Sequence, residues 1–367
     1  MKRLLSYILA LAAAASCVYP LDIKTDDYSE ETLVIDGSVI IGGTSRMTIS
    51  RLVPLDQLSS YSGGYVYNAL VTIESDKGDV FKDDTYPYTI NTYSAPSDRS
   101  YRLTVSYKGK IYSSPWIKPL PAPTITDVEF TGEPDRVTVS LSAKSDAAGY
   151  AAIQYDEIWK FHAEYVRIFE FNPIGGAISA IQDPDMSRYV CWRKKVREEE
   201  SLLDYSSTGG VVDSFPFAHF SRTNERNQYE YNILVRIRNL SDEEYRYFKH
   251  LADGTNNAST LFSPDPGNAE TNIVCESDPS EKVFGYVSIS SQSYYIATLD
   301  DKYYIPTEPS GLTHVDPEDY WKLYNAGYVP VNYNSDGTIG WGSARCYNCV
   351  SDGGTLTKPS FDIPGAE

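Results

Sequence analysis

The sequence predicts a mainly β protein, and three observations support this fold class. Apolar and polar residues alternate in several short runs, such as "NALVTIES" (68–75) and "YRLTVSY" (101–107). Alternation with a period of two is typical of half-buried strands. The 367 residues include 31 tyrosines but only three methionines and four histidines, and tyrosine favours strands and partly wet surfaces. Helix-capping signals stand out in only two segments.

Residues 32–120 are expected to form the first domain, a β-sandwich of immunoglobulin-like or transthyretin-like size. In "NALVTIES", Ala69, Val71 and Ile73 lie on one face of the predicted strand. "YRLTVSY" leads through "KGK" into "IYSS", which predicts a hairpin turned at Gly109. Together with "LVIDGSVI" (33–40) and "RMTISRL" (46–52), these runs predict about six strands and no helix.

Three prolines in "KPLPAPT" (118–124) mark the predicted domain boundary, because proline fixes φ and lacks an amide donor. The second domain, 121–367, is again expected to be mainly β, with strands in "VTVSLSA" (137–143) and "YEYNILVRIRN" (229–239). Glycine pairs and prolines make residues 172–223 an expected irregular stretch. Its charge run "RKKVREEE" (193–200) indicates a solvated strand end or a short helix face.

Two short helices are expected within the second domain. Ser241 and Glu244 have the spacing of a capping box, and Gly254 is the predicted stop. In "DPEDYWKLYNAG" (316–327), Asp316 is the predicted cap, a proline suits the first helical position, and Gly327 is the predicted end.

The N-terminus has the layout of a secretory signal. Lys2 and Arg3 precede an apolar run (4–15) that is too short to span a bilayer, and small residues lead directly to Cys17. A cysteine at this junction is similar to the lipobox of bacterial lipoproteins, which predicts a signal peptide at 1–16, a lipid on Cys17 and an acidic spacer at 17–31. Stable anchoring then depends on two or more acyl chains. The alternative is a secreted protein whose signal ends near a chance cysteine.

The formal net charge of −18 excludes some partner classes. Such a surface repels phosphate backbones and anionic headgroups, so nucleic-acid binding and electrostatic membrane docking are not expected. Membrane attachment would depend on the lipid alone, and that covalent lipid is the only expected prosthetic group.

Four cysteines remain beside Cys17, and an even number in an oxidising compartment indicates two disulfides. Three connectivities are possible, of which we favour Cys346 with Cys349 and Cys191 with Cys275. A zinc site is disfavoured because only one pair has ligand spacing, and a redox role because no helix pattern follows that pair.

The sequence contains no motif that selects an enzymatic reaction, and we expect no catalytic residues. Gly-x-Ser-x-Gly, His-Glu-x-x-His and a phosphate-binding loop are all absent, and the four histidines are dispersed. A glycosidase pair of carboxylates depends on spatial separation, so the sequence selects none. Asn332, Asn334 and Asp336 imitate the first half of a calcium loop, but the bidentate glutamate of an EF-hand is missing. A hairpin explains the same residues without a metal, and no metal site is predicted.

Aromatic residues suggest two uses that the sequence alone does not separate. The stretch "SYYIATLDDKYY" (293–304) and four tryptophans suit either sugar-stacking platforms or core and interface anchors. These four of the five tryptophans are Trp159, Trp192, Trp321 and Trp341.

The second half of the chain resembles a known family through the order of its motifs. These are "YNILVRIRNLS", "SDEEYRYFKHL", Phe262-Ser263-Pro264-x-Pro266, Asn272-Ile273, "VFGYVSISS", Cys346-x-x-Cys349, Gly353-Gly354 and Lys358-Pro359. The lipobox, "LVIDGSVI", "NALVTI" and the proline boundary extend the resemblance to the first half. The family is domain of unknown function 4249, a group of Bacteroidota outer-membrane lipoproteins. The resemblance implies a surface or periplasmic-face lipoprotein encoded beside a TonB-dependent transporter, and it implies no catalytic residues.

We therefore expect a non-enzymatic, lipid-anchored accessory or binding protein of the outer membrane that serves nutrient uptake. Its expected partner is a TonB-dependent transporter, with a glycan, peptide or chelate as cargo. A fimbrillin-like structural subunit or adhesin is the alternative, since pilins also combine a lipoprotein signal with two β-sandwiches and need cleavage after a basic residue such as Arg46 or Arg51. A glycan- or peptide-active hydrolase is the third reading.

Overall fold

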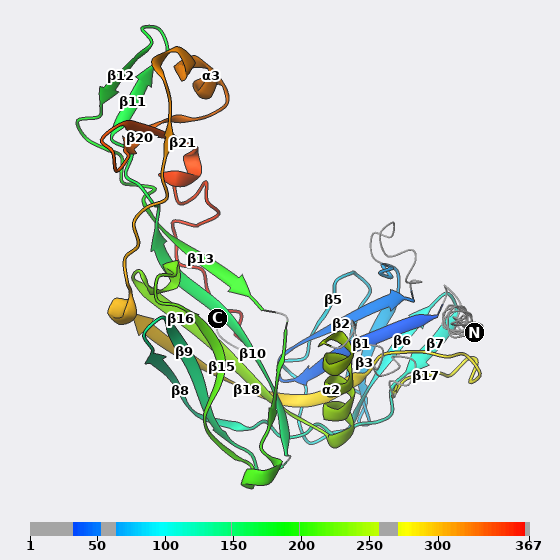
Figure 1. Ribbon diagram of the computed structural model, residues 1–367. Helices are drawn as coiled ribbons and strands as arrows, with labels where there is room; N and C mark the ends of the chain where they lie inside the picture. Colours follow the sequence, from blue (N-terminus) through cyan, green and yellow to red (C-terminus); the bar gives the residue numbers. More distant parts are fainter. Residues whose placement is uncertain (1–31, 53–63, 148, 198, 257–270, 364–367) are drawn as a thin grey trace, which may run out of the picture.

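The computed structural model describes residues 32–52, 64–147, 149–197, 199–256 and 271–363. The signal peptide, Cys17, the acidic spacer and the Phe262-Ser263-Pro264-x-Pro266 motif lie outside the described residues. The predicted fold class is confirmed, since most elements are strands in several sheets. No helix in the described part of the chain is long and apolar enough to cross a membrane. Figure 1 shows a bent molecule with two β-sandwiches and a smaller distal module.

One eight-stranded sheet runs through both sandwiches. Its order is β13-β10-β16-β18-β1-β2-β5, and β14 pairs with β10 beyond the end of β13. The strands are β13 (Val190–Val196), β10 (Tyr150–His162), β16 (Glu230–Leu240), β18 (Val287–Asp300), β1 (Leu33–Ile41), β2 (Thr44–Arg51), β5 (Tyr88–Asn91) and β14 (Ser201–Asp204). All neighbours are antiparallel except β1 and β18, which are parallel.

A five-stranded sheet covers β1, β2, β5 and the start of β18 and completes the first sandwich. Its strands, in order, are β17 (Val274–Cys275), β7 (Lys110–Ser113), β6 (Tyr101–Tyr107), β3 (Leu70–Ser75) and β4 (Val80–Asp83). The predicted inward residues Ala69, Val71 and Ile73 are fully buried in its core. Gly109, at φ +77°, makes the predicted hairpin turn between β6 and β7.

A three-stranded sheet covers the other half and completes the second sandwich. It consists of β15 (Val211–Ser221), β9 (Arg136–Lys144) and β8 (Thr124–Gly132). The odd-numbered residues of β16, among them Tyr231, Ile233 and Val235, fill the core between the sheets. The expectation that residues 172–223 are irregular was wrong, because β12, β13, β14 and β15 lie within this stretch.

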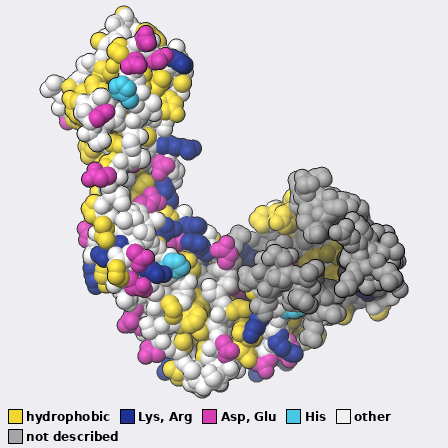
Figure 2. Space-filling view, in the orientation of Figure 1, with side chains coloured by type: hydrophobic (Ala, Val, Ile, Leu, Met, Phe, Trp, Pro, Cys, Tyr) yellow, Lys and Arg dark blue, Asp and Glu magenta, His cyan; other side chains and the backbone are white. Residues whose placement is uncertain are grey.

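The distal module lies at the far end of the molecule from the first sandwich (Figure 1). It contains the hairpin β11 (Phe169–Asn172) and β12 (Ala177–Ala180), and a small sheet of β19 (Thr313–His314), β21 (Ile339–Gly342) and β20 (Val329–Tyr333). Phe171, Val315 and Trp341 form its core. In Figure 2 this module carries mixed apolar and acidic side chains on its visible surface.

Both predicted helices are present, with differences at their ends. Helix α2 (Asp242–Asn256) begins as predicted, since the amide of Glu244 donates to the Ser241 hydroxyl over 3.1 Å, but it continues past the predicted stop at Gly254. A 3₁₀ turn (Pro317–Asp319) leads into α3 (Tyr320–Asn325), and Gly327 ends this segment at φ +85°. Asp316 occupies the predicted N-cap position, and a proline follows it, but the Asp316 side chain makes no capping hydrogen bond.

Strand β18 crosses from one sandwich to the other. Val287 and Ile289 at its start belong to the first core, whereas Ala297 and Leu299 near its end belong to the second. The proline-rich segment predicted as the domain boundary lies beside the middle of this strand, where the amide of Ser291 donates to the carbonyl of Leu120. Residues from the far side of the predicted boundary, including β17, therefore complete the first sandwich.

Substitution of Gly285 tests how tightly β1 is held against the segment before β18. Gly285 has φ +99°, and an added Cβ would lie 2.2 Å from the carbonyl oxygen of Ile35 in β1. Gly78 has a similar φ of +94° but open space around it, so it is a matched control. We expect Gly78→Ala to lower the free energy of unfolding by about 1–2 kcal/mol from backbone strain alone. Gly285→Ala should cost at least about 2 kcal/mol more because β1 must shift. Equal losses in urea unfolding would contradict this account.

Candidate functional site

The free face of the eight-stranded sheet carries a cavity. Both covering sheets pack on the other face, so side chains such as Ser38, Arg46 and Arg236 point away from the two cores. The cavity has a volume of about 650 Å³ and is bounded by β1, β2, β5, β10, β16 and β18, with α2 beside them. This volume is typical of small-molecule sites.

Three kinds of side chain line the cavity. The charged residues are Asp36, Arg46, Glu200, Arg236, Arg238 and Asp362. The aromatic residues are Tyr65, Tyr86, Tyr88, Phe248 and Tyr286. The neutral polar residues include Ser38, Thr44, Thr48, Thr89, Gln154 and Gln292. The cavity therefore offers donors, acceptors and apolar ring faces together.

Arg238 is the buried centre of the charged group. Its guanidinium is 2 % exposed and forms ion pairs with Glu200, over 2.7 Å, and with Glu244 at the start of α2. It also donates to the Ser288 hydroxyl over 3.3 Å. Burial alone would lower the pKa of Arg238, but Glu244 and Glu200 raise it above its usual value. The arginine thus stays charged and holds α2 against the sheet.

Asp36 is a half-buried carboxylate at this site. Its carboxylate accepts a hydrogen bond from the Tyr247 hydroxyl of α2 over 2.9 Å and one from the amide of Tyr286 over 3.0 Å. Burial raises the pKa of Asp36, and these two hydrogen bonds offset only part of the increase. The ring of Tyr247 in turn stacks on Tyr286.

Arg236 and Arg46 differ in how they are paired. Arg236 donates from Nη2 to Asp156 over 2.7 Å and to the backbone carbonyl of Asp362 over 3.3 Å. Among the described residues, the exposed Arg46 side chain makes no hydrogen bond or ion pair. It lies opposite Ser38 on β1 and Thr89 on β5. One cation at the cavity is therefore available to a ligand.

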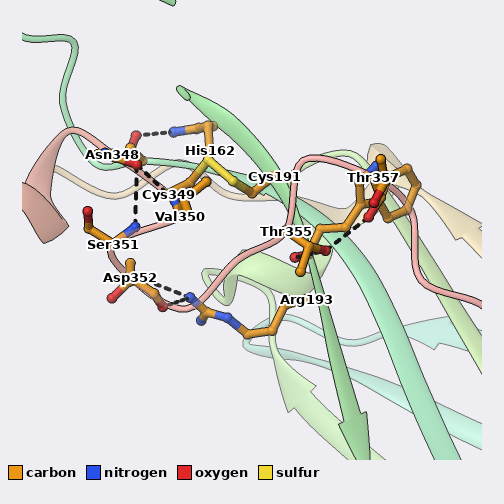
Figure 3. Close-up of a disulfide and its surroundings, with 12 residues drawn as sticks. His162, Cys191, Arg193, Asn348, Cys349, Val350, Ser351, Asp352, Thr355 and Thr357 are labelled. Carbon is orange, nitrogen blue, oxygen red and sulfur yellow. Dashed lines mark hydrogen bonds and ion pairs between the residues drawn. A yellow bond between two sulfur atoms is a disulfide. The ribbon is translucent and has the colours of Figure 1, made fainter. Parts of the chain in front are cut away.

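Among the described residues, one disulfide joins Cys191 on β13 to Cys349 (Figure 3). The favoured pairs Cys346–Cys349 and Cys191–Cys275 were wrong. Cys275 is buried on β17 in the first sandwich, where its thiol lies 3.7 Å from a carboxylate oxygen of Glu281, and Cys346 is also free. The chain folds Cys349 onto the edge strand of the second sandwich, which residue spacing alone does not indicate.

The segment after the disulfide lies along the free face of the sheet. Thr355 pairs with Trp192 on β13, and Arg193 forms an ion pair with Asp352 over 2.6 Å (Figure 3). Further along, Lys194 donates to the carbonyl of Ser360 over 2.9 Å. This tail then reaches the cavity, where Asp362 is a lining residue.

The calcium-loop imitation lies in the β20–β21 hairpin. Asn332 donates to the carbonyl of Val166, and Asp336 accepts from the amide and hydroxyl of Thr338. The backbone amide of Asn334 donates to the carbonyl of Thr338 and closes the loop, and its side-chain amide donates to the Thr338 hydroxyl. These turn contacts occupy the side chains, and no cluster of three His, Cys, Asp or Glu in the described ranges suits a metal ion.

The histidines and tryptophans do not converge on the cavity. His162, His219, His250 and His314 lie on four different elements: β10, β15, α2 and β19. Trp159 and Trp341 are core residues of the second sandwich and the distal module. Trp321 is 47 % exposed on α3, and Trp192 is half-buried beneath the tail. The choice between a sugar-stacking platform and a core anchor therefore differs from one tryptophan to another.

Sequence reasoning missed the cavity, although one local signal was present. In "YEYNILVRIRN", Arg236 and Arg238 alternate with the buried Val235 and Ile237, so a charged face of this strand could be predicted from the sequence. Their charged partners and the Asp362 carbonyl come from residues 156, 200, 244 and 362. No sequence spacing brings these together.

Comparison with known proteins assigns the chain to a family. Residues 18–296 match the family described as "Domain of unknown function (DUF4249)", and the chain belongs to it. No curated protein matches. The chain is similar to a two-domain fibronectin type III segment of chicken tenascin, at 12 % identity and a TM-score of 0.18, over 57 % of this chain and 92 % of that one. It is also similar to trypsin-activated α2-macroglobulin from Escherichia coli, at 13 % identity and a TM-score of 0.17, over 58 % and 15 % of the two chains.

Peptide mapping without reduction tests the disulfide. We expect a Cys191–Cys349 cross-linked peptide and alkylation of Cys275 only after unfolding, because that thiol is buried. Cys191→Ala should lower the free energy of unfolding by about 2–5 kcal/mol, whereas Cys346→Ser should cost much less. Recovery of a Cys346–Cys349 peptide would contradict the structure.

Asp36→Asn tests what the charge of this half-buried carboxylate costs in stability. An asparagine oxygen can still accept from Tyr247 and Tyr286, but it carries no charge. The folded pKa of Asp36 is raised, so its ionisation disfavours folding above that pKa and has no effect below the unfolded value. We therefore expect the variant to unfold at a higher temperature at pH 7 and the difference to disappear at about pH 3. A less stable variant at pH 7 would show that the charge itself holds α2.

Proposed function

We propose that the protein is a lipid-anchored accessory protein of the outer membrane that binds a ligand and associates with a TonB-dependent transporter, without catalysing a reaction. The cavity on the free face of the sheet carries this proposal. Several of its charged groups are fixed by partners, with Arg238 held between Glu200 and Glu244 and Asp36 held by Tyr247. Groups fixed in this way suit recognition rather than proton transfer.

The position of the lipid is consistent with this role. Fourteen residues, 18–31, separate Cys17 from Thr32. A chain of that length spans at most about 50 Å, so the first sandwich stays near the membrane that holds the lipid. The distal module lies at the opposite end of the molecule (Figure 1). The cavity between these ends would face a neighbouring membrane protein or its cargo.

A structural subunit is the second candidate, and the position of β1 favours it. Strand β1 pairs with β18 on one side and β2 on the other, and Leu33 and Ile35 fill the first core. Cleavage after Arg46 would cut β2 and release β1, which would leave a slot for a strand from another subunit. Assembly by strand exchange requires such a slot.

Purification from the native outer membrane tests both candidates. A tagged, lipidated protein is isolated in mild detergent and its partners are identified by mass spectrometry, with Cys17→Ala as the control. We expect stoichiometric recovery of a TonB-dependent transporter with wild type only, and a mature N-terminus at an acylated Cys17. Recovery of the protein alone, or a ladder of its own oligomers with an N-terminus after Arg46 or Arg51, would reject the accessory role.

A further inference from the structure

We propose that the cavity on the free face of the sheet binds a neutral, short oligosaccharide. This inference rests on the proposed binding function and names its ligand class. Three observations carry it: the pairing of the charged groups, the neutral polar floor and the aromatic side chains around the floor.

Most charged groups at the cavity are already paired, which disfavours a charged ligand. Among the described residues, the exposed side chains of Arg46 and Asp362, which carry opposite charges, form no ion pair. Arg238 is shared between the carboxyl groups of Glu200 and Glu244, and Arg236 is paired with Asp156. A carboxylate or ammonium group that took one of these partners would leave the other charge poorly compensated in a partly buried site, which is costly. A hydroxyl group has no such requirement, because it can use the remaining N–H donors and carboxylate lone pairs without breaking a pair.

The floor of the cavity presents groups that both donate and accept. Ser38, Thr48 and Thr89 contribute hydroxyl groups from β1, β2 and β5, and Gln154 and Gln292 contribute amides from β10 and β18. Strands β18, β1, β2 and β5 are consecutive neighbours about 5 Å apart, a spacing similar to that between hydroxyl groups across a sugar ring, whereas β16 separates β10 from β18. The chain's net charge of −18 further opposes an anionic ligand at long range.

Aromatic side chains add the apolar surface that a sugar ring needs. Tyr65 and Tyr86 pack with their ring centroids 5.3 Å apart, and Tyr286 stacks on Tyr247 at 5.1 Å. Rings such as those of Tyr65 and Tyr86 can cover the C–H face of a sugar. Figure 2 shows Lys and Arg side chains, interspersed with acidic ones, on the surface that faces the bend of the molecule.

Calorimetric titration of the lipidated full-length protein in detergent tests this inference. The probes are neutral trisaccharides of glucose, mannose, galactose, xylose and N-acetylglucosamine, with trigalacturonate and trialanine as the anionic and peptide arms. We expect at least one neutral trisaccharide to bind with a Kd below about 1 mM, changing less than about twofold between low and high salt.

Variants of Arg46 distinguish a neutral from a charged ligand. Arg46→Ala should weaken binding about fivefold to tenfold, because one hydrogen bond is lost. Arg46→Gln keeps a donor and should stay within about threefold of wild type. Arg136→Ala, an exposed arginine on β9 of the three-stranded sheet, is the matched control and should have no effect.

Two outcomes would overturn the inference. One is tighter binding of trigalacturonate or trialanine than of every neutral sugar, with equal losses in Arg46→Gln and Arg46→Ala. The other is that none of the neutral trisaccharides binds at a sugar concentration of about 5 mM. Because the transporter pull-down does not depend on the ligand, its success beside either outcome would leave the accessory role intact and reject only the saccharide.

Discussion

The parallel pairing of β1 with β18 is the interaction on which the rest of the structure depends. It joins residues 37–41 to residues 287–291 and so closes the first sandwich with a strand from late in the chain. The same β18 continues into the second core, where it pairs with β16. Two sandwiches that share one hydrogen-bonded strand cannot separate without breaking that ladder. The floor of the cavity is therefore a continuous sheet rather than a gap between two linked domains.

A sheet shared in this way has consequences for its uncovered face. Because both covering sheets pack on one side, the opposite side keeps the polar half of every alternating strand. Arg236 and Arg238 belong to that half, and their burial requires counter-charges. Glu244 at the start of α2 supplies one, and this ion pair explains why a helix lies on an otherwise open face. The charged network and the packing of α2 thus stabilise each other.

Local patterns in the sequence predicted local structure well. The strands at β3, β6, β9 and β16, and the capping box of α2, were readable because periodicity and capping depend on residues a few positions apart. The pairing of Cys191 with Cys349, across 158 residues, was not readable, because spacing does not reveal which strand edge a distant segment reaches. The cavity was missed for the same reason. Its lining residues range from position 36 to 362, and only the parallel register of β1 and β18 brings them together.

The C-terminal tail completes the site in a way that links its covalent and electrostatic parts. Cys349 fixes the start of the tail to β13, and the contacts of Thr355 and Ser360 then direct it along the free face. Only after this path does the carbonyl of Asp362 reach Arg236. A disulfide that stabilises the second sandwich through chain entropy therefore also positions one wall of the cavity. The same geometry explains why Cys346, only three residues earlier, lies unpaired near Gly342 in the distal module: the chain between the two cysteines leaves that module and enters the sandwich.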